Sequence, residues 1–274
     1  MENMDMVNRV MSTEQKEFYK EYGFVQVDNI LTKDEIAELT SYIEEAMSEQ
    51  GSRSQKTSTP DMSYYRVLNQ KVNVWRDHAG IARYTAHPLL AKVALELAEA
   101  SGIRLFHDQA LWKMPQDSKE TPWHQDFPYW PMNDEIGSEG VNRTKTVSVW
   151  IPLDDVDETN GCMMFVPGSQ KIGKLQGIDL VNPQNIFDEA KGTAIDTTKP
   201  VQVPLRKGSC TFHNGLTFHY AHANKTDKPR RVLAIIYMPD GTTYNGKAHI
   251  ITDPLNLKQD EKLQGGMFPL LARR

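Results

Sequence analysis

Residues 104–113 read Arg-Leu-Phe-His-Asp-Gln-Ala-Leu-Trp-Lys, and this run opens the part of the chain that decides the fold. From Ile103 onward the sequence is a series of short β-like runs separated by proline, glycine and asparagine. The clearest of the later runs cover residues 146–151, 162–167, 209–214 and 231–238. Strands that follow a helical segment are typical of a β-sandwich or barrel with helices packed on it. We therefore expect a mainly β protein with flanking helices.

The segment before these strands is predicted to be mostly helical. Capping-box patterns at residues 12–15 and 32–35 each mark the start of a helix. A short strand is expected over residues 23–27 and a third helix over about residues 88–100. The second helix should bury one apolar face, made of Ile36, Leu39, Ile43 and Met47.

The chain is expected to form one domain over residues 1–274. Within it we predict a helical buttress over residues 12–102, a β core over 103–245 and a C-terminal tail over 246–274. Although the length would allow two domains, the N-terminal helices are too few to enclose a core, so their apolar faces need the sheet. Residues 51–63, rich in Ser, Thr and Gly, and residues 129–145 are predicted loops.

Composition excludes several classes of partner. The 31 Lys and Arg residues against 36 Asp and Glu residues give a net charge of −5, so there is no basic surface for nucleic acid. No apolar run approaches the roughly 18 residues of a membrane span, and residues 1–11 lack the apolar stretch of a signal peptide. The two cysteines, Cys162 and Cys210, make no disulfide framework. We expect a cytoplasmic protein whose partner is a small molecule; the sequence does not indicate an oligomeric state.

The chemistry is indicated by two histidine clusters. His124 and Asp126 lie two residues apart in a strand-like run, which places both side chains on one face. A second cluster, His219 to Asn224, follows far downstream, with His222 as the competitor of His219. Two histidines and one carboxylate on one side of a metal are the ligand set of non-haem Fe(II) oxygenases. Such a set leaves coordination positions open for a cosubstrate and O2.

In three ordered blocks the chain resembles the phytanoyl-CoA dioxygenase family of Fe(II)- and 2-oxoglutarate-dependent oxygenases. The first block is residues 123–126, the second runs from Trp150 to Lys171, and the third runs from His213 to Arg230. The resemblance covers about residues 18–238. It implies a double-stranded β-helix, the cupin-like jelly roll, buttressed by N-terminal helices.

The resemblance also implies roles for individual residues. His124, Asp126 and His219 fall on the iron ligands, and Arg230 falls on the arginine that binds the distal carboxylate of 2-oxoglutarate. Gln125 and Trp150 fall on positions that line the cosubstrate, and Gln109 on a further contact. The implied reaction consumes O2 and 2-oxoglutarate, oxidises an unactivated C–H bond of a small molecule, typically to an alcohol, and releases succinate and CO2. The carboxylate of Asp126 speaks against halogenation, because halogenating relatives need a small residue there.

Several alternatives stay open at this point. Arg231 competes with Arg230, because strand alternation lets only one of them face a cavity. Tyr220 and Ala221 replace the usual Gly-Ser pair after the distal histidine, so Tyr220 is expected to crowd the site. His107 is as compatible with the core as with a pocket wall, whereas His78, His87 and His249 are interpreted as structural or surface residues. The rival functions are a cupin-like metal enzyme without 2-oxoglutarate and a non-catalytic metal-binding relative.

Overall fold

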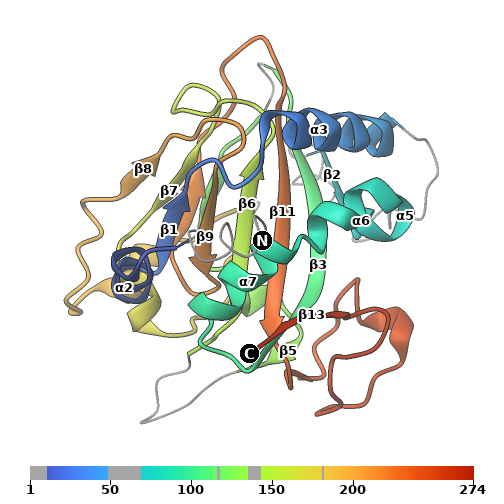
Figure 1. Ribbon diagram of the computed structural model, residues 1–274. Coiled ribbons are helices and arrows are strands. Elements are labelled where there is room, and N and C mark those ends of the chain that lie inside the picture. Colours follow the sequence, from blue (N-terminus) through green and yellow to red (C-terminus); the bar gives the residue numbers. More distant parts are fainter. Residues whose placement is uncertain (1–10, 49–68, 116–117, 135–142, 181) are drawn as a thin grey trace.

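The computed structural model describes residues 11–48, 69–115, 118–134, 143–180 and 182–274. Its centre is a seven-stranded sheet in the order β1-β9-β6-β11-β3-β13, in which β2 also pairs with β3 (Figure 1). The strands of this large sheet are β1 (Phe24–Val27), β2 (Asn69–Val72), β3 (Gly102–Lys113), β6 (Val147–Pro152), β9 (Cys210–Asn214), β11 (Arg230–Pro239) and β13 (Leu270–Arg273).

A four-stranded sheet in the order β4-β10-β7-β8 packs against the large sheet. Its strands are β4 (Thr121–His124), β7 (Met163–Phe165), β8 (Val201–Val203) and β10 (His219–Ala221). Buried side chains from both sheets, among them Trp150, Phe165 and Val232, form one apolar cluster. A two-stranded ribbon pairs β5 (Met132–Asn133) with β12 (Thr243–Tyr244). The predicted fold class, a mainly β jelly roll with flanking helices, is confirmed.

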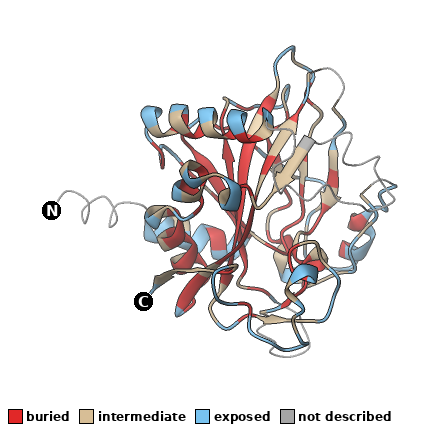
Figure 2. Cartoon of the chain, turned by 90° about the vertical axis from the view of Figure 1, so that its right-hand side faces the viewer, coloured by how far each residue is buried: buried red, intermediate tan, exposed pale blue. Residues whose placement is uncertain are grey.

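The helices cover the other face of the large sheet, as Figure 2 shows. Because apolar side chains pack on both faces, the central strands are buried throughout: all of β6 and most of β11 are shielded from solvent. The helices are α2 (Thr13–Tyr22), α3 (Lys33–Ser48), α5 (Val74–Asp77), α6 (Ala79–Thr85) and α7 (Pro88–Leu97). Short 3₁₀ turns are η1 (Phe127–Tyr129), η2 (Ser169–Ile172), η3 (Ile186–Ala190) and η4 (Asp253–Leu255).

Both predicted capping boxes are present. Ser12 and Gln15 exchange side-chain and backbone hydrogen bonds at the start of α2, and Thr32 and Glu35 do so at the start of α3. The predicted apolar face of α3 packs on the sheet, with Ile36, Leu39 and Ile43 buried and Met47 partly buried. The third predicted helix is α7, which ends at Leu97, a little earlier than expected.

Several short elements were not predicted, among them β2, α5, α6, β5, β8, β12 and β13. Strand β13 lies inside the predicted tail and pairs with β3. The strands β2 and β13 lack a complete period of their own and are fixed by pairing with β3. The predicted loop over 51–63 and the middle of the loop over 129–145 lie outside the described residues.

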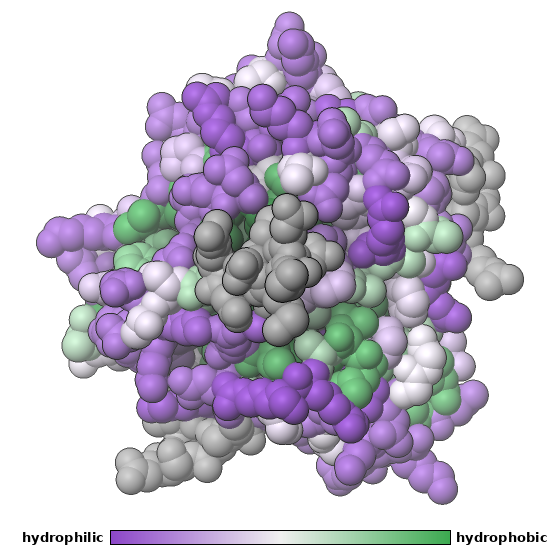
Figure 3. Space-filling model, viewed as in Figure 1, coloured by the Kyte–Doolittle hydropathy of each residue, from purple (hydrophilic) through white to green (hydrophobic). Residues whose placement is uncertain are grey.

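The face of the molecule seen in Figure 3 is mainly hydrophilic, with small apolar patches between polar side chains. In the described ranges, no helix combines the length and the apolar character needed to cross a bilayer.

Candidate metal centre

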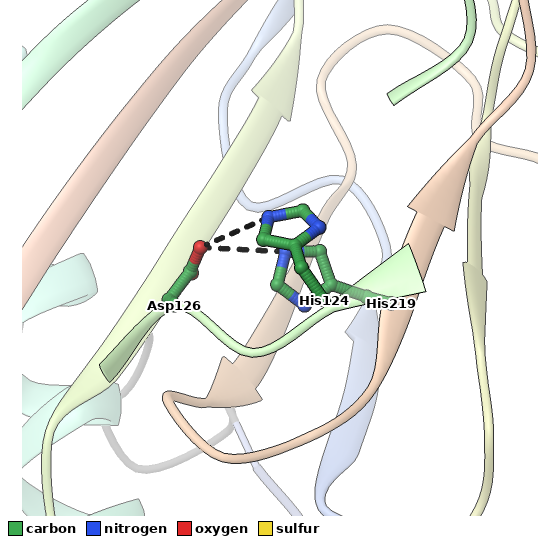
Figure 4. A group of neighbouring side chains, drawn as sticks. All are labelled: His124, Asp126 and His219. Carbon is green, nitrogen blue, oxygen red and sulfur yellow. Dashed lines mark ion pairs between the residues drawn. The ribbon is translucent and has the colours of Figure 1, made fainter. Parts of the chain in front are cut away.

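Three side chains converge where the small sheet meets the cavity between the two sheets (Figure 4). His124 ends β4 and His219 begins β10, and the antiparallel register of these strands places the two residues opposite each other. Asp126 follows directly after β4. Its Oδ1 lies 3.5 Å from Nε2 of His124 and 3.4 Å from Nε2 of His219. One possible ligand atom from each residue lies within 4.8 Å of the other two.

The hydrogen bonds of the two rings fix which nitrogen faces the centre. Nδ1 of His124 donates to the carbonyl of Pro122 at 2.7 Å, and Nδ1 of His219 donates to the carbonyl of Thr217 at 2.9 Å. Each Nε2 therefore presents a lone pair when its ring is neutral. Burial, with the charge of His219, lowers the pKa of His124, which favours that neutral form.

Asp126 supplies the negative charge of the centre. Burial on its own would raise the pKa of this carboxyl, but the charge of His219 and the hydrogen bonds of the surrounding histidines hold it well below its usual range. Two imidazole lone pairs and one carboxylate oxygen thus point at a common space. This donor set fits a divalent transition metal such as Fe(II).

A second layer holds the other oxygen of Asp126. Oδ2 accepts a hydrogen bond from the Ser148 hydroxyl at 2.9 Å and lies 3.2 Å from Nε2 of His213. Ser148 on β6 and His213 on β9 are paired in register, so the large sheet presents both groups together. Neither Ser148 nor His213 was predicted from the sequence to have a role. The signal for His213 was its position on the strand directly before His219.

The three side chains line a cavity of about 460 Å³. Arg230, at the start of β11, lies on the wall of this cavity and is only 2% exposed. Its guanidinium carbon is 5.4 Å from the ring centroid of Trp150, and both Trp150 and Gln109 also line the cavity. Arg230 therefore makes this end of the cavity electropositive. Its register partner, Lys113, is also buried, and its Nζ donates to the backbone carbonyls of Ala221 and His222. Burial and the neighbouring Arg230 lower the pKa of Lys113 well below its usual range, which favours the neutral amine.

The structure shows where the competing residues Arg231, His222 and Tyr220 lie. Arg231 points to the other face of the large sheet, where it pairs with Asp154 and Glu44. His222 lies outside the ligand cluster and its Nε2 is 3.4 Å from the amide of Gln202. The ring of Tyr220 stacks on Trp123, and its hydroxyl donates to Glu120 at 2.7 Å. That hydroxyl is thus held by the residue before β4, and Tyr220 is one of the residues that line the cavity.

The structure does not bring Gln125 to the cosubstrate wall. Its side chain points away from His124 and Asp126 because neighbouring residues alternate. The amide nitrogen donates to the carbonyls of Gly173 and Leu216, both at 2.8 Å, and the amide oxygen accepts from the backbone N–H of Leu175. Gln125 thus joins two loops behind the metal ligands.

His249, interpreted as a structural or surface residue, lies on the wall of the cavity. The segment after β12 folds back over the cavity, so Lys247, His249 and Ile250 line it. His107 lies on the same wall, so of its two interpretations, a core residue or a residue of the pocket wall, the second holds. A sequence read without the fold gives no sign that a C-terminal segment closes a site built more than a hundred residues earlier.

Comparisons with known proteins agree with this geometry. The sequence pattern described as phytanoyl-CoA dioxygenase (PhyH) matches residues 19–232. The peroxisomal phytanoyl-CoA dioxygenase of Rattus norvegicus is 25% identical over 247 residues, covering 84% of this chain and 69% of the rat protein. The ectoine dioxygenase of Bordetella bronchiseptica is 25% identical over 252 residues, covering 86% of this chain and 78% of that protein.

Solved structures give the same result. The non-haem α-ketoglutarate-dependent carbocyclase SnoK from nogalamycin biosynthesis superposes with a TM-score of 0.76 at 25% identity, covering 96% of this chain and 97% of SnoK. The epimerase SnoN, solved with Fe3+, α-ketoglutarate and nogalamycin RO, gives a TM-score of 0.72 at 28% identity, covering 98% and 99% of the two chains.

Proposed function

The chain belongs to the phytanoyl-CoA dioxygenase family, and from this premise we propose that His124, Asp126 and His219 hold the Fe(II) of a 2-oxoglutarate-dependent oxygenase. The observation that carries the proposal is the convergence of two Nε2 lone pairs and one carboxylate oxygen on one side of the cavity. The enzyme acts on a small molecule, as its relatives do on ectoine or on nogalamycin intermediates.

Arg230 is the proposed anchor of the cosubstrate. A guanidinium offers two parallel donors that match a carboxylate and stays charged when buried. Its burial on the cavity wall, with the guanidinium carbon 5.4 Å from the centroid of the Trp150 ring, favours an anionic group at this end. Gln109 lines the same wall and is kept as a cosubstrate contact.

When bound, Fe(II) and 2-oxoglutarate supply the redox chemistry, in which O2 is consumed, succinate and CO2 are released, and a substrate C–H bond is oxidised. The chain contributes position and shielding. His124 and His219 keep their Nε2 lone pairs aimed at the metal through the bonds from Nδ1 to backbone carbonyls. Ser148 and His213 hold Asp126 in one orientation. The two sheets exclude water from the reacting groups.

Neither rival function accounts for the whole site. A cupin-like enzyme without 2-oxoglutarate would assign no ligand to the electropositive end of the cavity. A non-catalytic relative would have no use for the open cavity next to the metal ligands.

The two buried, unpaired cysteines favour a reducing compartment, in keeping with a cytoplasmic protein.

The proposed function is tested by coupled turnover. Purified protein is supplied with Fe(II), 2-oxoglutarate and a library of small metabolites, and succinate and O2 uptake are measured together. We expect succinate in proportion to O2 consumed for the wild type and His222→Ala, and loss of at least about a hundredfold for His219→Ala. Equal turnover by His219→Ala and the wild type would refute the ligand assignment.

A further inference from the structure

The cavity has a second polar end, away from Arg230. Along β11, Arg230 pairs with Lys113 and Ile236 pairs with His107 on β3. Six residues of strand separate the two positions, or roughly 20 Å at the usual rise. At the far position His107 meets His249 from the C-terminal segment, with ring centroids 6.2 Å apart and an angle of 31° between the rings. Phe106 packs against both rings.

The two rings are held in opposite tautomers. Nδ1 of His107 lies 3.3 Å from the carbonyl of Asp108, which only accepts, so Nδ1 carries the proton and Nε2 is an acceptor. Nδ1 of His249 accepts from the backbone N–H of Ile251 at 3.2 Å, so its proton lies on Nε2, which is a donor. Among the described residues neither Nε2 has a hydrogen-bond partner, and neither is one of the fully buried unsatisfied atoms. Both are therefore accessible from the cavity that the rings line.

We propose that His107 and His249 together recognise a neutral hydroxyl group of the substrate, His107 accepting its hydrogen bond and His249 donating one to its oxygen. This inference rests on the proposed function and deepens it by naming a substrate class. A carboxylate has no proton to give His107, and an ammonium group has no lone pair to accept from His249. A hydroxyl is both donor and acceptor, so one such group satisfies both rings.

Both rings stay neutral at physiological pH. Burial lowers the pKa of His107 to about 3, helped by the neighbouring His249, and burial lowers the pKa of His249 to about 4. Around the pair the cavity wall is largely apolar or aromatic, formed by Val72, Trp130, Ile236 and Ile250. The substrate class is thus a molecule that carries a hydroxyl group on an apolar body.

The test uses a matched pair of probes, 2-naphthol and 2-methoxynaphthalene, which differ in the ability to donate a hydrogen bond. Binding of each is measured by calorimetry at pH 7, without O2, to protein loaded with Fe(II) and 2-oxoglutarate and to metal-free protein. We expect the wild type to bind the alcohol at least about tenfold more tightly than the ether in both forms, because the ether leaves His107 unsatisfied.

Three variants locate the effect. His107→Phe removes the acceptor that only the alcohol can use and keeps an aromatic ring, so it is expected to reduce the alcohol-to-ether ratio to within about threefold. His249→Phe removes a donor that the oxygen of either probe can accept from, so it is expected to weaken both probes alike, by about fivefold, and to keep the ratio. His222→Phe makes the same change outside the cavity and should keep both the wild-type ratio and the wild-type affinities. A thermal melt confirms that each variant is folded, and either cavity variant alone is sufficient for the test.

Any of four results would overturn the inference: no saturable binding of 2-naphthol to the wild type, equal affinity of the wild type for both probes, an unchanged alcohol-to-ether ratio in His107→Phe, or unchanged affinities for both probes in His249→Phe. The proposed function fails separately. If the ratio behaves as expected while 2-oxoglutarate does not bind, the hydroxyl site stands and the cosubstrate assignment falls.

Discussion

The two carboxylate oxygens of Asp126 have different neighbours. Oδ1 faces Nε2 of His124 and of His219, whereas Oδ2 is held by Ser148 and His213. Groups that orient a metal ligand typically contribute about 10- to 100-fold to metal affinity. We therefore predict that Ser148→Ala and His213→Phe each weaken Fe(II) binding by roughly that factor. Competition with a chromophoric chelator measures the change. Ser209→Ala, a buried serine remote from the centre, is the control, and an equal loss there would contradict the prediction.

The neighbouring arginines of β11 allow a matched comparison. Arg230→Lys keeps the charge but loses the two-pronged donor, so we predict about tenfold or greater weakening of 2-oxoglutarate binding. Arg231→Lys changes a residue paired with Asp154 on the opposite face and should leave that affinity within about twofold. Calorimetric titration of both variants with 2-oxoglutarate measures these affinities. If Arg230→Lys and Arg231→Lys bound 2-oxoglutarate equally well, the cosubstrate would not be anchored by Arg230.

The orientation of a single side chain was predictable where strand alternation determined the face on which it lies. Alternation along the strand-like run placed His124 and Asp126 on one face and turned Gln125 away, although the family resemblance had given Gln125 a cosubstrate role. The pair of Ser148 and His213 was not predictable, because their meeting at Asp126 depends on the register between β6 and β9. His249 was missed for the same reason: a chain segment far away in sequence had to be placed first.

At the scale of elements, the junction between α2 and β1 depends on Gly23. This residue has φ of 81°, caps α2, and would place an added Cβ 2.4 Å from side-chain oxygens of Gln170 and Thr217. Gly192 has the same positive φ with open space around it. We predict that Gly192→Ala costs about 1 kcal/mol of unfolding free energy, the usual left-handed strain. Gly23→Ala should cost clearly more, because it adds a steric clash. Urea denaturation compares them, and equal costs would contradict the role of the contact.

Elements differed in how far the sequence could predict them. Long apolar strands such as β3 and β11 and the capped helices α2 and α3 carry their own periodicity and end signals. The short β2 and β13 have too few residues to show a period, and both depend on β3 for their hydrogen bonds. The pairing of β4 with β10, which brings His124 and His219 together, has no signal in the local pattern; the resemblance implied only that these residues share a function.

For the whole molecule, a buried acid ties the helices to the sheet and makes stability depend on pH. Burial raises the pKa of Asp108 to about 7, although its carboxylate accepts hydrogen bonds from the Thr85 hydroxyl and the Trp75 N–H. In the unfolded chain this acid titrates near 4. The folded state therefore holds an extra proton between these values, and its stability falls as the pH rises from about 4 to about 7.

The corresponding variant is Asp108→Asn, which cannot titrate. We predict that the stability difference between wild type and variant changes by up to about 1.4 kcal/mol per pH unit within that window, in the direction that disfavours the wild type at higher pH. Guanidinium unfolding curves at several pH values measure it. A difference that is constant from pH 4 to pH 7 would show that Asp108 is not protonated on folding.

The central claim is that His124, Asp126 and His219 hold iron from one side of the cavity and leave coordination positions open for 2-oxoglutarate and O2. The most direct measurement is a titration of the metal-free protein with Fe(II) and then 2-oxoglutarate in the absence of O2, followed by visible absorption. We predict a weak charge-transfer band that saturates at one iron per chain in the wild type and is absent in His219→Ala. A wild-type protein without the band, or a variant that develops it fully, would contradict the account.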